Sequence, residues 1–282
     1  MPELPEVETI ARDVRPHLEG RTIVTARLFK TDVLRQIRRP AFERGVRGRQ
    51  VRSVGRRAKH VVLELDDGRR VVIQPRMTGS LLVDRRGSTV DRGRRPRDPY
   101  DVLHLDLDSG ARIRYRDVRR LGAIFLLSPT QWTRYDAALG PEPLEPSFTP
   151  DSLAAILRDA GLAVKKALMD QRRLAGVGNI YANEALWIAR IDPSRAARTV
   201  QPEEAERLHA AVVDVLARSI RGRGTTVRDY RTGTGEPGGF QGRLAVYERA
   251  GEPCLRCGGG KRVALTHAID SRSTYFCPGC QR

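Results

Sequence analysis

Residues 1–10 read MPELPEVETI, and the rest of the chain is best interpreted outward from this stretch. Pro2 is small enough to permit removal of the initiator Met1, which would leave a proline as the N-terminus. A secondary amine is a nucleophile once unprotonated, and α-amino groups have an ordinary pKa of about 7.7–8.0. The stretch therefore offers covalent imine chemistry without a catalytic lysine. The plain alternative is an ordinary frayed terminus.

The same stretch begins a helix. Pro5 suits a first helical turn, and Glu3, Glu6 and Glu8 lie at its positive end, where they serve either chemistry or only the helix dipole. Apolar side chains follow at helical spacing at Val7, Ile10, Val14 and Leu18.

The chain has 282 residues, enough for two domains, with 51 Lys and Arg against 34 Asp and Glu, a net charge of +17. This excess favours a polyanionic partner, either nucleic acid or an anionic membrane surface. Arginine outnumbers lysine, which a GC-rich genome would also produce. No apolar run is long enough to span a membrane, and no basic-then-apolar leader precedes the first helix. We expect a cytoplasmic protein that binds nucleic acid.

Short alternating stretches predict an antiparallel β domain, a sandwich, in the first half of the chain. They cover residues 22–28, 50–54, 60–65, 70–74, 102–107, 111–115 and 123–127. Residues 84–99, rich in Arg, Gly and Pro, predict a mobile surface loop that either contacts nucleic acid or stays solvated.

Helical periodicity dominates the second half. Residues 139–146 are a proline-rich linker, after which Thr149 or Asp151 caps a helix and a longer one covers residues 202–220. Gly176 and Gly178 precede a further helix that begins near Asn179. Residues 222–242 hold seven glycines and predict a flexible loop, either a lid over a ligand or a disordered connector. The predicted domains are 1–130, a linker 131–150, 151–240 and 241–282.

The strongest local signal is a doubled CxxC pattern near the end of the chain. Its cysteines are Cys254, Cys257, Cys277 and Cys280. This spacing is typical of one structural zinc ion, and four protein ligands leave no position for a catalytic water. The alternative, a redox-active CxxC pair, is disfavoured because the pattern is doubled. Arg272 lies between the pairs, at the expected tip of a β-hairpin that suits a phosphate.

Three weaker signals also suggest nucleic-acid contacts. Gly176-Val-Gly178-Asn179 places a helix N-terminus where a phosphate could bind. Lys59 stands at the start of a strand, where a solvated charge is the usual finding. Met77 and Leu121 could be apolar wedges between bases, with neighbouring arginines on phosphates, although such pairs are more often core and surface residues.

Taken together, these motifs resemble the formamidopyrimidine-DNA glycosylase family, bacterial base-excision repair enzymes also called 8-oxoguanine DNA glycosylases. The resemblance spans nearly the whole chain. It rests on PELPEVET at 2–9, GRRAK at 55–59, MTGSL at 77–81, RDVRR at 116–120, LGPEPL at 139–144, LMDQ and AGVGNIYANEAL within 168–186, GTTVRDY at 224–230 and SRSTYFCPGCQ at 271–281.

The resemblance implies an α+β fold: an N-terminal antiparallel β-sandwich flanked by a helix, then a helix-two-turn-helix domain and a β-hairpin zinc finger. It implies that Pro2 attacks C1′ of a damaged nucleotide and that β- and δ-elimination then cleave the strand. Glu3 would be the acid that helps open the sugar, and Glu6 would orient the site. Lys59 would act in β-elimination and contact a phosphate, and Arg272 would be the zinc-hairpin arginine.

The resemblance also implies a monomer that binds damaged duplex DNA and is located in the bacterial cytoplasm, at the nucleoid. The implied DNA contacts divide into gap filling, an apolar wedge and phosphate binding. The residues are Met77 and Arg119 in the gap, Leu121 as the wedge, and Arg120, Lys165 and Asn179 on phosphates. The glycine-rich loop would cover the flipped purine.

This chain departs from the family pattern at three positions. Gln74 stands where a histidine is usual, so Arg76 is a candidate to replace its phosphate contact; Leu121 replaces the wedge phenylalanine; and Val102 replaces a basic residue. These changes put the lesion preference and the opposite base in question. Two alternatives stay open: an endonuclease VIII-like enzyme for oxidised pyrimidines, and a non-catalytic zinc-dependent DNA-binding protein.

Overall fold

The computed structural model describes residues 2–84, 97–227, 229–258, 260–269 and 271–282. The predicted surface loop at 84–99 falls mostly outside these ranges. The chain forms two compact units, one of residues 1–137 and 222–239 and the other of residues 138–221 and 240–282. The three domains and the linker predicted from the sequence are a different kind of division and stay a prediction.

The first unit is built on two antiparallel four-stranded sheets within the described residues. One sheet has the order β1 (Ile23–Leu28), β6 (Asp101–Leu107), β7 (Arg112–Asp117) and β5 (Gly79–Asp84). The other has the order β2 (Val51–Arg57), β3 (His60–Leu65), β4 (Arg70–Gln74) and β8 (Ala123–Leu127). A single apolar core joins both sheets, as the sandwich prediction requires.

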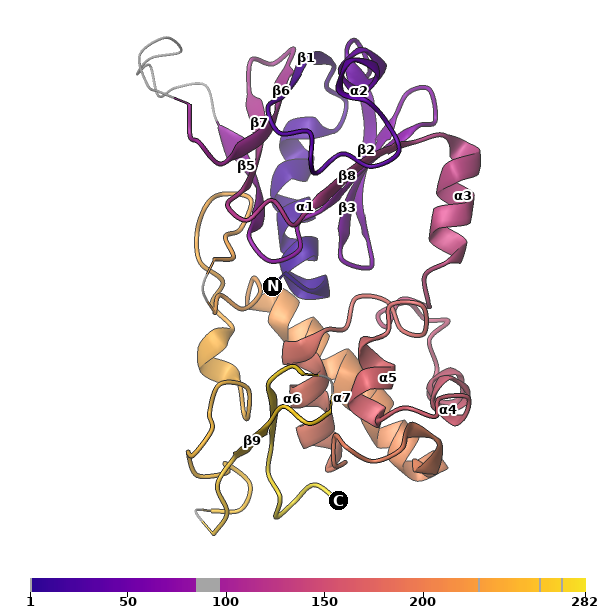
Figure 1. The fold of residues 1–282 in the computed structure, drawn as a ribbon, viewed down its shortest axis with the longest axis vertical. Coiled ribbons are helices and arrows are strands. Elements are labelled where there is room, and N and C mark those ends of the chain that lie inside the picture. The colour runs from indigo at the N-terminus through magenta and orange to yellow at the C-terminus, as the bar shows by residue number, and fades with distance from the viewer. Residues whose placement is uncertain (1, 85–96, 228, 259, 270) are drawn as a thin grey trace. The chain divides into compact units, whose positions relative to one another are not determined.

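Helix α1 (Leu4–Leu18) packs against strands of both sheets, β2 and β3 on one side and β5 on the other (Figure 1). Its apolar stripe, including Val7, Ile10 and Val14, is fully buried in the common core. Helix α2 (Arg39–Val46) adds Phe42 and Val46 to that core. Burial of this stripe fixes the N-terminus of the chain against the sandwich.

Strand β3 is buried on nearly every residue instead of alternating, because both faces of its sheet are covered. Helix α3 (Pro129–Ala137) places Trp132 and Tyr135 over Val62 and Val72, on the face away from the main core. The sequence prediction had the linker begin at residue 131; the structure instead continues α3 to Ala137.

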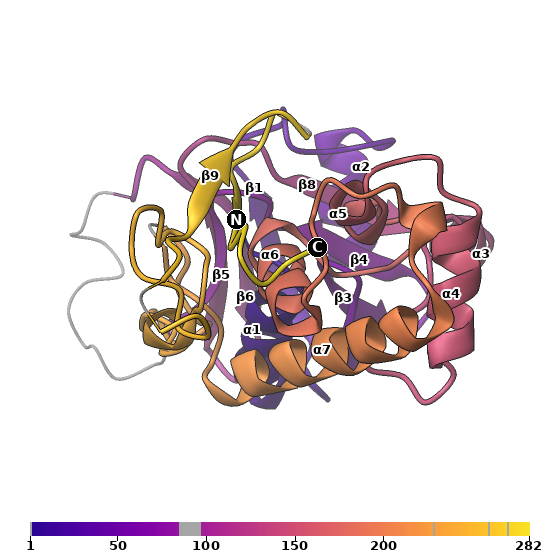
Figure 2. The ribbon, with the colours of Figure 1, turned by 90° about the horizontal axis from the view of Figure 1, so that it is seen from below.

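The second unit is mainly helical. It contains α4 (Pro150–Arg158), α5 (Val164–Met169), α6 (Asn179–Ala189), a short 3-10 turn at Ala197–Thr199 and α7 (Pro202–Arg221), the helix that Figure 2 shows in full length beside α4 and α6. Helix α6 is buried almost all round, since α5, α7 and strand β10 pack on it. Strands β9 (Ala264–Thr266) and β10 (Thr274–Phe276) form the expected antiparallel hairpin.

The glycine-rich segment after α7 belongs to the first unit through residues 222–239. Its described residues form no strand of either sheet. A single β-bridge links two residues of the segment itself, Thr225 and Gly239. Local hydrogen bonds nevertheless define its path, among them Gly238 N–H to Thr226 Oγ1 at 2.8 Å and Gly235 N–H to Thr232 O at 2.9 Å. The described part is therefore an organised loop.

Candidate active site and nucleic-acid interface

The N-terminal residues are held by a capping box at the start of α1. Pro2 is buried, Glu3 is the N-cap, and Glu6 occupies the third helical position. The Glu3 N–H donates to Glu6 Oε2 at 2.8 Å, and both glutamates are 1% exposed. Glu6 Oε1 accepts the N–H of Thr225 at 2.7 Å. One buried carboxylate thus connects the residue beside Pro2 to the glycine-rich loop.

Lys59 lies in the two-residue turn between β2 and β3. It was predicted to begin a strand, and the structure places it one position before β3. The preceding Ala58 has φ +51°. Arg56 joins this turn to α1, because its Nε binds Glu8 Oε2 at 3.1 Å and its Nη1 donates to the Ala58 carbonyl at 3.0 Å. Burial opposes ionisation of Glu8, but Arg12 and Arg56 outweigh it and lower its pKa.

Asp117 joins the two loops that carry the predicted gap-filling residues. It is fully buried, and its Oδ1 accepts the hydroxyl of Thr78. Its Oδ2 accepts the Gly122 N–H at 2.8 Å and the Tyr115 hydroxyl at 3.3 Å. Thr78 Oγ1 in turn accepts the Arg119 N–H at 2.9 Å. The sequence analysis did not single out Asp117, although RDVRR contains it.

The side chains on these loops are available at the surface of the first unit. Met77 is 41% exposed and Leu121 37%, so both of these large apolar side chains are open to solvent. Arg119 Nη1 lies 3.4 Å from Met77 Sδ, so the two predicted gap-filling residues are in contact. Arg120 pairs with Asp32 at 3.0 Å, and Arg76 Nε bonds Gln74 Oε1 at 3.1 Å.

Left-handed backbone recurs beside the predicted site residues. The non-glycine residues Ala58, Arg76, Arg120 and Ser271 have φ between +50° and +60°. They stand next to Lys59, Met77, Leu121 and Arg272 respectively. Such conformations cost of the order of 1 kcal/mol each and persist where surrounding contacts impose them, commonly at functional sites.

In the second unit, one carbonyl collects contacts from two predicted DNA-binding residues. Asn179 Nδ2 donates to Ser273 O at 3.0 Å, and Lys165 Nζ lies 3.3 Å from the same oxygen and 2.6 Å from Thr274 Oγ1. Lys165 has no exposed surface. Its ammonium therefore supports the hairpin that carries the exposed Arg272, and does not extend from the surface as a phosphate ligand would.

Two further buried residues of α6 bind later segments of the chain, Asn183 the same hairpin and Glu184 residues 245–247. Asn183 accepts the Tyr275 N–H at 3.2 Å and donates to Asn179 O at 2.7 Å. The Glu184 carboxylate accepts three consecutive N–H groups, those of residues 245–247, at 2.8–3.0 Å. Burial raises the pKa of Glu184 despite these donors. Both residues lie within ANEAL, but their roles depend on partners far along the chain.

The four cysteines converge, as the spacing predicts. Their sulfur atoms all lie within 4.8 Å of one another, with Cys254 and Cys280 at 3.9 Å and Cys257 and Cys277 at 3.6 Å. A tetrahedron with metal–sulfur bonds of about 2.3 Å has edges of about 3.8 Å. Trp187 Nε1 lies 3.5 Å from Cys254 Sγ and Arg256 Nη1 3.6 Å from Cys280 Sγ. The donor set therefore fits one metal ion.

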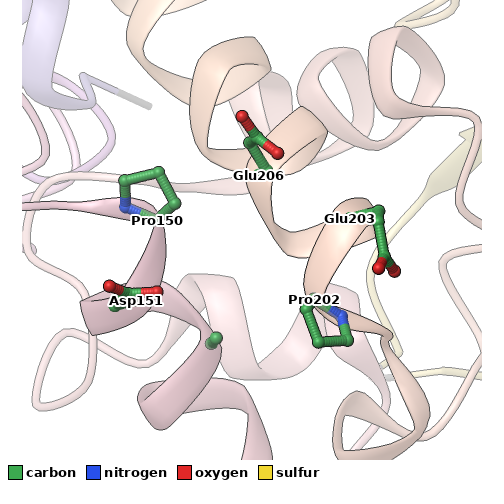
Figure 3. Close-up of a pocket in the computed structure, with 6 residues that line it drawn as sticks. Pro150, Asp151, Pro202, Glu203 and Glu206 are labelled. Carbon is green, nitrogen blue, oxygen red and sulfur yellow. The ribbon is translucent and has the colours of Figure 1, made fainter.

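A cavity of 380 Å³ lies between the first turns of α4 and α7 (Figure 3). Asp151, Glu203 and Glu206 line it with two prolines and Ala154. Three carboxylates make this cavity unsuitable for a DNA phosphate, despite the two helix N-termini. None of the predicted site residues lines it.

Comparison with known families agrees with this arrangement of motifs. Residues 1–124 match the formamidopyrimidine-DNA glycosylase N-terminal domain, and residues 139–231 match the corresponding H2TH domain. The chain belongs to the formamidopyrimidine-DNA glycosylase family. A member from Chloroflexus aggregans is 44% identical over 284 residues, covering 100% of this chain and 98% of that protein. One from Xanthomonas axonopodis is 43% identical over all of both chains.

Solved structures of the formamidopyrimidine-DNA glycosylase family share the fold. The MutM (Fpg) protein of Thermus thermophilus superimposes with a TM-score of 0.85 at 36% identity, covering 99% of this chain and 98% of that one. A Lactococcus lactis Fpg mutant bound to Fapy-dG DNA gives 0.89 at 29% identity, with both chains fully covered. The predicted family, fold class and enzyme class are thereby confirmed. Within the described residues, no helix combines the length and apolarity needed to cross a membrane.

Proposed function

We propose that the protein excises oxidised purines, including formamidopyrimidines, from duplex DNA and then cleaves the strand through an imine at Pro2. The observation that carries the proposal is the capping box that holds Glu3, the residue after Pro2, with the buried Glu6 accepting the Glu3 N–H at 2.8 Å. Full-length similarity to glycosylases of this name, one solved with a Fapy-dG DNA, supports the substrate class.

The reaction begins when the Pro2 nitrogen, free after removal of Met1, attacks C1′ and the N-glycosidic bond breaks. The base leaves with the bonding electrons and takes up a proton, and Glu3 protonates the sugar-ring oxygen as the ring opens to an iminium. The iminium acidifies the C2′ hydrogen. Loss of that proton expels the 3′-phosphate in β-elimination, and a second elimination expels the 5′-phosphate.

Other residues of the first unit would position the DNA. Lys59, on the turn that Arg56 connects to α1, is the candidate for β-elimination and a phosphate contact. Met77 and Arg119 would occupy the space vacated by the flipped nucleotide, with Leu121 as the wedge. Arg120 would exchange Asp32 for a backbone phosphate, an easy exchange because both side chains are about half exposed.

The second unit would supply Asn179 and Arg272 as phosphate contacts. Lys165 would act through the hairpin that it supports. One zinc ion on the four cysteines would stabilise that hairpin, and because all four positions are protein ligands it would take no part in the chemistry. A monomer in the bacterial cytoplasm, associated with the nucleoid through DNA, suits the +17 charge.

The substrate and the strand products test this proposal. Purified protein is incubated with duplexes that carry 8-oxoguanine opposite cytosine, a formamidopyrimidine, thymine glycol or no lesion, and base release and strand ends are resolved separately. We expect purine release and a gap with phosphate on both ends, and neither product from a protein that keeps a peptide extension before Pro2, because the Pro2 nitrogen is then part of a peptide bond. Faster release of thymine glycol would favour the endonuclease VIII-like reading. Binding without release of any base would favour the non-catalytic one.

A further inference from the structure

We propose that Asp13 is a positioning residue that holds the glycine-rich loop, residues 222–239, on helix α1 before DNA binds. The inference rests on the proposed function, which gives this loop the flipped purine to cover. Asp13 takes no part in the chemistry as proposed, and none of the family motifs quoted above includes it. Its connection to the site comes from its contacts with the loop.

One oxygen of Asp13 receives two donors from separate parts of the loop. Asp13 Oδ2 accepts the Gly233 N–H at 2.9 Å and Arg223 Nη2 at 3.0 Å. The Asp13 side chain is only 10% exposed, whereas Arg223 is 45% exposed. A largely buried carboxylate that accepts one neutral and one charged donor makes stronger hydrogen bonds than a solvated one.

The loop is shaped to allow this contact. A Cβ on Gly233 would lie 2.6 Å from Asp13 Cβ, so the close approach requires glycine. The Gly233 carbonyl accepts the Val83 N–H of β5 at 3.1 Å, so the N–H and the carbonyl of Gly233 are both hydrogen-bonded. Arg223 adopts φ +61°, a conformation that favours glycine, and its carbonyl accepts the Tyr230 hydroxyl at 3.1 Å.

Asp13 therefore acts as a second anchor, two helical turns after Glu6 on α1. Glu6 holds Thr225 near the start of the loop, and Asp13 holds Gly233 on its returning limb. A loop already held at both points loses less conformational entropy when it covers a base. The effect should appear in base excision, which needs the base covered, and not in cleavage of an abasic site, which has no base.

Four variants separate this role from a general effect on folding. Asp13→Ala removes both bonds, and Asp13→Asn keeps an oxygen that can accept the Gly233 N–H but loses the charge that binds Arg223. Arg223→Gly removes the ion pair while relieving the left-handed backbone. Asp214→Asn is the matched control, because it breaks an exposed aspartate–arginine pair between two residues of helix α7.

Two measurements follow: amide hydrogen exchange of Gly233 in the free protein, and single-turnover rates on an 8-oxoguanine duplex and on a preformed abasic duplex. For Asp13→Ala we expect exchange about tenfold faster and base excision about tenfold slower, since loss of the Gly233 N–H bond to a charged acceptor alone corresponds to about a factor of ten. Asp13→Asn and Arg223→Gly should fall between that variant and wild type, and abasic cleavage by Asp13→Ala should stay within about twofold.

Unchanged or faster excision by Asp13→Ala, or an equal loss on the abasic duplex, would overturn the inference. Failure of the proposed function looks different. The wild-type protein would then release no base and cleave no abasic site, while the exchange of Gly233 would still report whether Asp13 holds the loop.

Discussion

Glu6 Oε1 accepts the backbone N–H of Thr225 at 2.7 Å, although 219 positions separate the two residues. The other oxygen of the same carboxylate accepts the N–H of Glu3. Gly224 makes room for this contact, because a Cβ there would lie 3.0 Å from Glu6 Cγ and Oε1. The first residues of the chain and the glycine-rich loop therefore form one hydrogen-bonded site within the first unit.

Glu6→Gln should slow base excision by about ten- to a hundredfold, since an amide offers one acceptor where two N–H donors must be satisfied and an unsatisfied buried donor costs about 1–3 kcal/mol. Single-turnover excision measures the effect. Glu19→Gln is the control: Glu19, at the other end of α1, accepts the Val54 N–H through one oxygen only, which glutamine can replace. Equal rates for the two variants would contradict this role of Glu6.

Asp117→Asn should lower the free energy of unfolding by about 1–3 kcal/mol. Both oxygens of Asp117 accept hydrogen bonds, so the NH₂ group of the amide would face at least one of these buried donors and leave it unsatisfied. Urea denaturation measures this loss. The loops of Met77 and Arg119 should also separate, giving a smaller change in fluorescence of 2-aminopurine placed opposite an abasic site. Asp108→Asn, in an exposed turn, is the control. A wild-type fluorescence change in Asp117→Asn would argue against the role given to Asp117.

Cys257→Ser should abolish stoichiometric zinc and weaken DNA binding, because a structural site with three sulfur ligands loses both affinity and the shape of the hairpin. Metal analysis by mass spectrometry and DNA binding at a fixed salt concentration check this. Leu255→Ser changes an exposed residue of the same CxxC segment and should retain zinc. A purified wild-type protein that folds and binds DNA with no metal would refute the zinc assignment.

The second unit should lose stability in acid through Glu204. Arg195 contacts both Glu204 oxygens at 2.7 Å, and its hydrogen bonds lower the pKa of Glu204 from 4.5 to about 2. A lowered folded-state pKa gives stability that is present above pH 4.5 and lost as the pH falls toward 2. Between pH 5 and pH 2 the free energy of unfolding of Glu204→Gln should therefore fall by about 1–2 kcal/mol less than that of wild type, after allowance for solvent screening. Urea denaturation at each pH measures the difference, and an equal fall in the free energy of unfolding for the two proteins would contradict this prediction.

Local sequence predicted the strands well where turns and alternation coincide. Strands β3 and β4 have the predicted limits because Asp66-Asp67-Gly68 separates two apolar runs, and Gly68 takes the required positive φ of +80°. Helix α3 and strand β5 were not predicted. The prolines of residues 139–146 suggested a linker, which was extended back to residue 131 over α3, and Gly79–Asp84 was interpreted only as part of the MTGSL motif.

The site was predicted in its residue identities but not in its supports. The residues that organise it have partners far along the chain: Asp13 with Gly233, 220 positions away, and Lys165 with Thr274, 109 positions away. The seven glycines of residues 222–242 predicted a flexible loop. The order of this segment was missed because no local pattern reveals that two carboxylates of α1 bind it. Lys165 was predicted only as a phosphate contact; its burial could not be foreseen, since only the folded hairpin supplies the acceptors that permit it.

The most direct test of the account is reductive trapping. The protein is mixed with an abasic duplex and borohydride, and the covalent adduct is digested and mapped by mass spectrometry. We expect a reduced linkage on the amine of Pro2, in a chain that lacks Met1, and no adduct at Pro2 in a protein that keeps a peptide extension before it, because the Pro2 nitrogen is then part of a peptide bond. An adduct on Lys59 or another lysine, or a fully active protein that retains Met1, would contradict it.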